Sequence, residues 1–99
     1  MTGDKVLLTP RAQGDLEEIW DYTADRWVPK QAQTYTRRLS NDIVAVAAQP
    51  SLGRDCSLAR RGYFNYPSGS HVLFYRLTPG GIAVVRILHQ RMDYERHIP

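Results

Sequence analysis

The chain has 99 residues, 42% of them hydrophobic and 23% charged, a composition that excludes a chain disordered throughout. This length suits one domain with a single modest core, so we expect residues 1–99 to fold together. No apolar run approaches the roughly 20 residues of a membrane span, and the N-terminus lacks a secretory signal pattern. The single cysteine, Cys56, has no disulfide partner within these residues. We therefore expect a cytoplasmic protein with no membrane partner.

The net charge of +3 is distributed unevenly along the chain. Residues 1–50 carry six basic and seven acidic side chains, a net charge of −1. Residues 51–99 carry seven arginines and three acidic side chains, a net charge of +4. Arginine forms paired hydrogen bonds with carboxylates and with phosphates. The second half of the chain therefore suits either an acidic protein or a nucleic acid, although a dedicated DNA-binding domain usually carries more charge.

A short strand over 5–9 and a pair of helices are predicted for the first half. Thr9 suits an N-cap and Pro10 suits the first helical position, so the first helix is predicted over 10–26. Residues at the spacing of one helix face indicate its core side: Ala12, Leu16, Ile19, Trp20, Thr23 and Trp27. After Pro29 a second helix is predicted over 30–48, and the short connection makes the two an antiparallel hairpin.

The second half of the chain predicts a small sheet. After an irregular segment over 50–62, short strands are predicted over 63–66, 71–78 and 82–89. The last two are almost continuously apolar, as expected of strands inside a sheet. Residues 90–99 form a polar tail with at most a short helical turn. The expected fold class is α+β, with the N-terminal strand and the helical hairpin packed on a small antiparallel β-sheet.

The hairpin turn sets the register of the last two strands. A three-residue loop of Pro79, Gly80 and Gly81 predicts four opposed pairs: Thr78 with Ile82, Arg76 with Val84, Phe74 with Arg86, and His71 with His89. Arg76 and Arg86 then share one face of the sheet, either as structural side chains or as binding side chains. A two-residue loop would shift the pairing by one residue and separate each pair.

The groups available for proton transfer are few. His71 and His89 would form an acid–base pair or two strand-end histidines; as a metal site they lack further ligands, so we expect no metal and no cofactor. Asp55 is the only carboxylate between Ile43 and Met92, and Tyr75 is the other candidate. The aromatic run over 63–66 suits cross-strand packing better than stacking on bases.

Three stretches carry a recognisable pattern. They are Leu8 to Thr23 (LTPRAQGDLEEIWDYT), Ser68 to Arg76 (SGSHVLFYR) and Val85 to Asp93 (VRILHQRMD). Together with Pro50 and Gly53, this pattern resembles the ParE toxins of type II toxin–antitoxin modules, within the RelE/ParE superfamily, and it covers nearly the whole chain.

The resemblance implies a fold and two partners. The fold would be that of the RelE/ParE superfamily. A ParD-like antitoxin would wrap the toxin, and DNA gyrase would be the target, trapped so that DNA breaks accumulate. The module would serve plasmid or chromosomal maintenance, or a stress response. We expect no sequence-specific contact with nucleic acid.

These implications give two sets of candidate contacts and no catalytic residue. The gyrase contact is expected within residues 86–96, at Arg86, His89, Arg91, Met92 and Asp93. Antitoxin contacts are expected from apolar side chains on the helical hairpin and from arginines meeting carboxylates: Trp20, Trp27, Arg61, Arg76 and Arg86. Two alternatives stay open, namely a RelE-like endonuclease that cleaves messenger RNA on the ribosome and a non-toxic adaptor domain.

Overall fold

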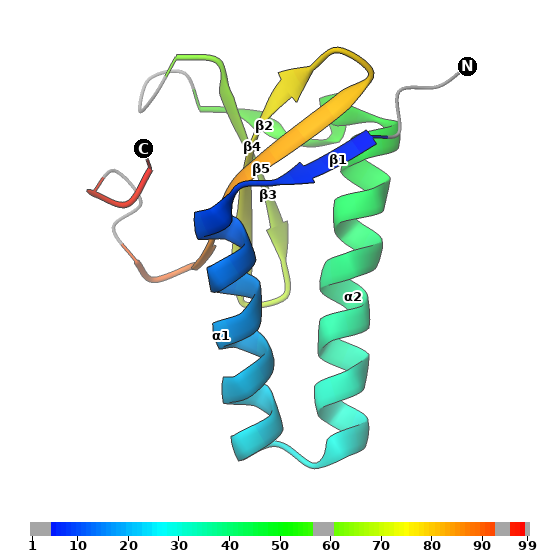
Figure 1. Ribbon diagram of the computed structural model, residues 1–99, viewed down its shortest axis with the longest axis vertical. Helices are drawn as coiled ribbons and strands as arrows, with labels where there is room; N and C mark the ends of the chain where they lie inside the picture. Colours follow the sequence, from blue (N-terminus) through cyan, green and yellow to red (C-terminus); the bar gives the residue numbers. More distant parts are fainter. Residues whose placement is uncertain (1–4, 57–60, 93–95, 99) are drawn as a thin grey trace.

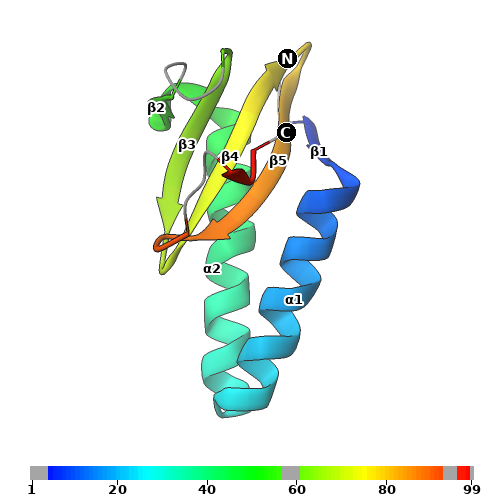
Figure 2. The same ribbon diagram turned by 90° about the vertical axis from the view of Figure 1, so that its left-hand side faces the viewer.

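The computed structural model describes residues 5–56, 61–92 and 96–98. Figure 1 shows two long antiparallel helices beside a twisted sheet, and Figure 2 shows that both helices cover the same face of that sheet. This arrangement confirms the predicted α+β fold. The elements in chain order are β1 (Lys5–Leu8), α1 (Pro10–Arg26), α2 (Pro29–Ala48), a 3-10 turn (Pro50–Leu52), β2 (Arg54–Asp55), β3 (Tyr63–Ser68), β4 (His71–Thr78) and β5 (Gly81–His89).

The helix predictions are confirmed to within one residue. The Thr9 hydroxyl accepts a hydrogen bond from the Ala12 amide at 3.2 Å, and Pro10 occupies the first turn of α1. Pro29 opens α2 in the same way. A proline fits this position because its missing N–H would have no partner within the helix. The tip of the hairpin, where α1 ends and α2 begins, projects beyond the sheet (Figure 1).

The sheet has five strands in the order β1-β5-β4-β3-β2, and it is mixed. β1 runs parallel to β5, with Leu8 opposite Val84, whereas the other pairs are antiparallel. The expectation of a purely antiparallel sheet is therefore corrected. A parallel partner needs a long crossover, and the helical hairpin provides that crossover between β1 and the rest of the sheet.

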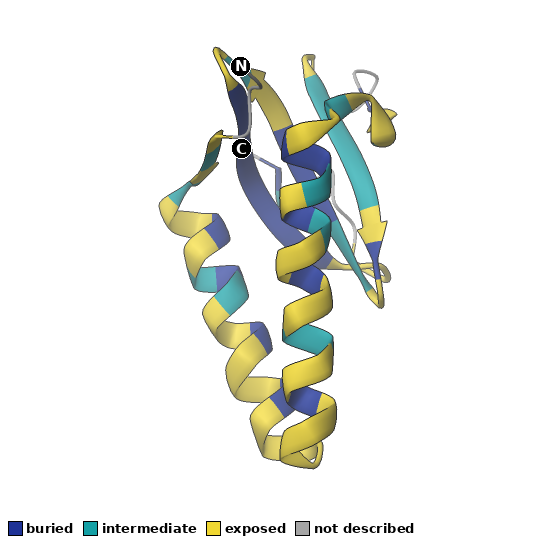
Figure 3. Ribbon diagram, turned by 90° about the vertical axis from the view of Figure 1, so that its right-hand side faces the viewer, coloured by how far each residue is buried: buried dark blue, intermediate teal, exposed yellow. Residues whose placement is uncertain are grey.

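Two apolar clusters hold the layers together. The larger lies between the helices and the sheet and includes Leu39, Val46, Leu73, Tyr75 and Ile82. The smaller lies on the opposite face of the sheet and comprises Cys56, Phe74, Val85, Leu88 and Ile98. Figure 3 shows the buried positions of both helices turned toward the sheet. Ile98 brings the C-terminal segment onto the outer face, so this segment belongs to the packed structure.

The prediction that the two tryptophans of the first helix lie in the core is wrong. Trp20 is 47% exposed and Trp27 is 37% exposed. Trp20 borders a groove toward the polar side of α2, where Gln33 and Arg37 also lie. Trp27 lies at the projecting tip of the hairpin, where the sheet no longer covers it. Periodicity predicted the correct face, but that face extends past the core.

The β4–β5 turn contains two residues, not three. Thr78 pairs with Gly81, and Arg76 pairs with Ala83, so the predicted pairs Thr78–Ile82 and Arg76–Val84 are wrong. Gly80 has φ +84°, and with proline before it this is the backbone of a type II turn.

A β-bulge then restores the predicted register further along the hairpin. Val84 pairs with Tyr75 and Arg86 pairs with Phe74, so Val85 is the extra residue on β5. Beyond this bulge His71 lies opposite His89. The predicted pairs Phe74–Arg86 and His71–His89 are confirmed, although the loop that was expected to produce them is absent.

Candidate functional site

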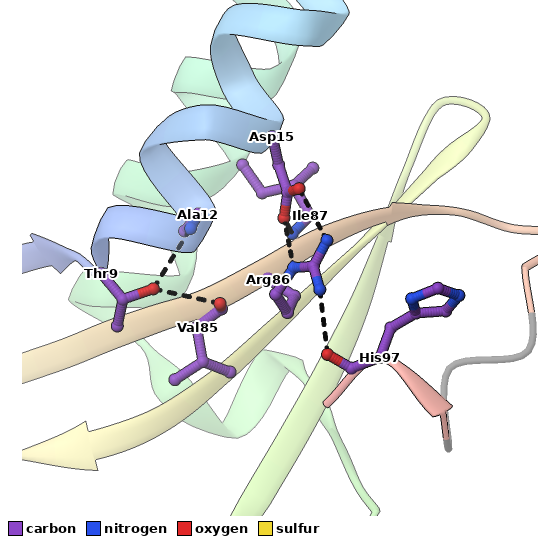
Figure 4. A network of polar contacts seen from close by, with 7 residues as sticks. All are labelled: Thr9, Ala12, Asp15, Val85, Arg86, Ile87 and His97. Carbon is purple, nitrogen blue, oxygen red and sulfur yellow. Dashed lines mark hydrogen bonds and ion pairs between the residues drawn. The ribbon is translucent and has the colours of Figure 1, made fainter. Parts of the chain in front are cut away.

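A buried ion pair joins α1 to β5 (Figure 4). The Arg86 guanidinium donates from Nε and Nη2 to the two carboxylate oxygens of Asp15, at 2.7 and 2.8 Å. Its Nη1 donates to the carbonyl of His97 at 3.0 Å. Hydrogen bonding to Asp15 is the main cause that raises the pKa of Arg86. The side chain is 8% exposed, so this arginine, predicted as a contact for both partners, is held within the protein.

The ion pair also completes the edge of the sheet. β1 ends opposite Val84, which would leave the next part of the β5 edge without hydrogen-bond partners. The Thr9 hydroxyl donates to the Val85 carbonyl at 3.1 Å, and the Asp15 carboxylate accepts the Ile87 amide at 2.9 Å. Unpaired backbone groups are costly when buried, so the start of α1 continues the pairing that β1 begins.

The Ser-Gly-Ser-His stretch forms the turn between β3 and β4 and fastens it to α2. The Ser68 hydroxyl donates to Asp42 at 2.6 Å. The Tyr35 hydroxyl accepts the Ser70 amide at 3.0 Å and lies 2.5 Å from Nδ1 of His71. The Tyr35 hydroxyl therefore links the turn between β3 and β4 to α2 through both Ser70 and His71.

The two histidines lie at the open end of the β4–β5 hairpin, the end away from the Pro79–Gly80 turn. Their rings meet edge to face, with centroids 5.4 Å apart. The pKa of His71 is lowered mainly by burial and secondly by His89, while Asp15 opposes the shift. The Arg91 amide donates to Nδ1 of His89 at 3.2 Å. Both Nδ1 atoms are therefore engaged in internal hydrogen bonds.

The other candidates for proton transfer lie elsewhere. Tyr75 is buried and donates its hydroxyl proton to the Pro50 carbonyl at 2.6 Å, and burial raises its pKa. It stands four residues from His71 along β4, roughly 13 Å at the rise of a strand. Asp55 is on β2, at the far edge of the sheet. The structure does not bring the four candidates into one site.

Three of the five predicted target contacts lie together at the end of β5. His89 and Met92 line one hollow between α1 and the sheet. Arg91 is exposed beside them. Asp93 lies outside the described residues, and Arg86 is buried in the ion pair with Asp15.

The predicted antitoxin contacts are spread over several surfaces. Arg76 is exposed near the hairpin turn, opposite Tyr63 of β3, and Arg61 is exposed just before that strand. Trp20 borders the groove between the helices, and Trp27 lines the hollow beside the histidines. These residues do not form one contiguous patch. A partner that contacts all of them must therefore be an extended chain that runs over several surfaces.

Several residues that build this region were not predicted from the sequence. The helix periodicity around Asp15 and Tyr35 does not reveal which residues they bind. Their partners, Arg86 and His71, are more than 35 positions away in the chain. The one available signal was the Ser-Gly-Ser-His stretch, which proves to be the anchor of a turn.

The described part of the chain offers neither a metal site nor a membrane span. In residues 5–56, 61–92 and 96–98, no three histidine, cysteine, aspartate or glutamate side chains are grouped so as to hold a metal ion. Neither α1 nor α2 combines the length and the apolar character that a bilayer crossing requires.

The fold and sequence have known counterparts. A Toxin ParE1 from Mycobacterium tuberculosis (strain CDC 1551 / Oshkosh) is 53% identical over 95 residues, which are 95% of this chain and 97% of that protein. A Toxin ParE1 from Caulobacter vibrioides is 40% identical over 91 residues, 92% of this chain and 94% of that protein. A solved chain from the chromosomal ParDE TA system of P. aeruginosa has a TM-score of 0.72 at 16% identity, covering 86% of this chain and 94% of its own, and shows the same fold.

The family comparison agrees with these likenesses. The model of the family described as ParE toxin of type II toxin-antitoxin system, parDE, matches residues 6–94. The chain therefore belongs to the ParE toxin family of type II toxin–antitoxin systems.

Proposed function

We propose that this toxin acts in the cytoplasm by binding DNA gyrase, and that a ParD-like antitoxin neutralises it. The observation that supports a binding mechanism is the scatter of the candidate proton-transfer groups over three parts of the sheet. Cleavage of RNA needs an acid, a base and a cation around one phosphate. In the described residues, Tyr75 lies roughly 13 Å from His71 along β4, and Asp55 lies on β2 at the far edge of the sheet. Nδ1 of each histidine is held in an internal hydrogen bond.

The gyrase contact is proposed at the end of β5, where Arg91 and Met92 are exposed beside His89. Asp93 remains a predicted contact. Arg86 is buried and does not contact gyrase in this proposal, but it holds the residues that follow β5 in place. Because Arg86 donates to the His97 carbonyl and Ile98 is 5% exposed, the segment after β5 is tied to the sheet at both ends. A truncation after residue 89 would remove core contacts, so single substitutions are the appropriate tests.

The antitoxin contact is proposed at the turn end of the hairpin and on the helices. Carboxylates of the antitoxin would pair with Arg61 and Arg76, and apolar side chains would pack near Trp20 and Trp27. Arg76 neighbours buried Tyr75, and successive strand residues point to opposite faces. It therefore projects from the face of the sheet that the helices leave open. An exposed guanidinium there is free to form paired bonds with a carboxylate.

The decisive experiment is a supercoiling assay with purified gyrase. The purified toxin is expected to inhibit supercoiling, and an equimolar ParD-like antitoxin is expected to restore it. Because His89 belongs to the proposed gyrase contact, the test for proton transfer uses His71 alone. His71→Asn is expected to inhibit as the natural chain does, because the proposed mechanism moves no proton. Supercoiling that proceeds normally with an excess of folded toxin would refute gyrase as the target.

The contact between His71, His89 and Tyr35 favours one second candidate, the RelE-like endonuclease. Its test is messenger RNA integrity on translating ribosomes to which the toxin is added. Cleavage that is lost in His71→Asn would replace the gyrase proposal with this one. Expression without an antitoxin that causes neither growth arrest nor RNA loss would instead indicate the adaptor function.

A further inference from the structure

A hollow of about 430 Å³ opens between α1 and the open end of the β4–β5 hairpin. Its walls are unusually aromatic. Tyr22 and Trp27 line it from the end of α1, and Tyr35 lines it from α2. Tyr22 is 56% exposed, and Trp27 meets Tyr35 edge to face with centroids 5.1 Å apart. Exposed aromatic side chains around a concave site are typical of binding surfaces.

The hollow carries one carboxylate that lies outside its buried ion pair. Asp15 and Arg86 both line it, but they neutralise each other in their ion pair. Glu18 also lines it and is exposed. Within the described residues, Glu18 has no ion-pair partner. The charge of Glu18 acts on Arg86 only at longer range, so a cation that enters the hollow would meet a carboxylate that is not already in an ion pair.

The aromatic rings suit the same ligand. The guanidinium carbon of Arg26 lies 4.5 Å from the centroid of the Tyr22 ring, so this ring already binds a guanidinium on one face and an incoming cation would use the other face. By contrast, the hollow on the other side of Trp27 is lined by Lys30 and Arg38 and by no carboxylate. Of the two hollows that Trp27 borders, the one lined by Glu18 therefore favours a cationic ligand.

We propose that this hollow receives an arginine or lysine side chain of the target protein, with the cation against Tyr22 and Trp27 and paired with Glu18. The inference deepens the proposed function, because it assigns the inserted side chain to gyrase. The antitoxin is expected to present carboxylates, and the hollow beside Trp27 that suits carboxylates is the other one, lined by Lys30 and Arg38. We therefore assign the antitoxin contact of Trp27 to that side and the inserted cation to gyrase. Met92, at the rim of the hollow, joins this site to the proposed gyrase contact.

The site can be tested without gyrase by using a small probe. N-acetyl-arginine amide is titrated into the toxin while the indole N–H signals of the two tryptophans are followed by NMR. The Trp27 signal is expected to shift in a saturable manner, and the Trp20 signal, in the groove between the helices, serves as the internal control. The citrulline analogue keeps the shape without the charge and is expected to have no effect. Equal shifts at both indoles, or none at Trp27, would overturn the proposal.

Adjacent glutamates provide the matched variants. Glu18 lines the hollow, whereas Glu17 lines the groove on the other side of α1. Glu18→Gln is expected to weaken probe binding about tenfold, the loss of one charge-assisted contact, and Glu17→Gln is expected to leave it unchanged. Both side chains are exposed, so neither substitution disturbs the core. Equal effects of the two variants would refute the role of Glu18.

A gyrase-binding measurement completes the test. If gyrase binds the natural chain, Glu18→Arg is expected to weaken binding at least tenfold because it replaces attraction with repulsion, while Glu17→Arg is not. If gyrase does not bind the natural chain but the probe shifts Trp27, the proposed target fails and the cation site stands. If gyrase binds equally well to both variants, the cation site fails and the target stands.

Discussion

The two ends of the β4–β5 hairpin present their polar and charged side chains on opposite faces of the sheet. At the turn end, Arg76 projects from the face that the helices leave open, and Leu77 beside it is 53% exposed. At the open end, His71 and His89 face the helices and are partly enclosed by Tyr35 and Trp27. The difference arises because the helical hairpin projects past the open end (Figure 1). A projecting hairpin creates a hollow, whereas the uncovered face presents isolated charges.

The largest effect is expected from breaking the ion pair that holds the open end together. Asp15→Ala would leave the buried charge of Arg86 without its partner, the Ile87 amide without its acceptor, and the C-terminal segment less firmly held. We expect a loss of about 3 to 5 kcal/mol in the free energy of unfolding, measured by urea denaturation. Combining Asp15→Ala with Arg86→Met should recover part of that loss. A single variant within about 1 kcal/mol of the natural chain would contradict the structural role of this pair.

Two glycines at opposite ends of β3 sharpen the comparison. Gly62, near the turn end, has φ +81° and open space where a Cβ would lie. Gly69, at the open end, has φ +61°, and its Cβ would lie 2.6 Å from the Tyr35 ring. Gly62→Ala should destabilise by about 1 kcal/mol from backbone strain alone. Gly69→Ala should cost about 2 to 3 kcal/mol because Tyr35 must also move. Equal midpoints in thermal unfolding would contradict this account.

Charge reversal at each end should separate the two partners. Arg76→Glu is expected to weaken antitoxin binding roughly tenfold and to leave gyrase inhibition unchanged. Arg91→Glu is expected to weaken gyrase inhibition and to leave antitoxin binding unchanged. Calorimetric titration with the antitoxin and the supercoiling assay measure the two effects. Variants that weaken both partners to the same extent would show that the two surfaces overlap.

The smallest expected effect is a pH dependence of stability that comes from His71 at the open end of the hairpin. The pKa of His71 lies below its ordinary value of 6.5 in the folded chain, so the unfolded chain takes up the proton first as pH falls. The contribution of His71 to stability is therefore fully present above pH 6.5 and declines as pH falls below it. His71→Asn should remove this part of the pH dependence, seen as a smaller difference in urea midpoints between pH 7.5 and pH 5.5. An unchanged difference would contradict the shift.

Most of the secondary structure was predictable because its signals are local. Thr9 and Pro10 specify the start of α1 through capping and a fixed φ, and the boundaries of β4 follow from its apolar run. The pairing of His71 with His89 was also predicted, but from a loop that the structure lacks. A two-residue turn and a bulge at Val85 together produce the same register. A bulge depends on how the strand packs against its surroundings, so sequence spacing alone does not reveal it.

The candidate site was predicted less well for a related reason. Arg86 had the charge expected of a contact residue, but Asp15, 71 positions earlier in the chain, binds it internally. Trp20 and Trp27 had the spacing expected of a core, but they border grooves. Whether a charge is paired or an aromatic ring is covered depends on segments distant in sequence.

By itself the sequence determined the helices, the inner strands, the uneven charge and the family pattern, because each of these depends on neighbouring residues. Only the tertiary structure decided which arginines are exposed and where β1 pairs. It also decided that an aromatic hollow with a carboxylate outside its buried ion pair lies beside the histidines. Those properties depend on burial and distance, which are set when α1, α2 and the sheet pack together.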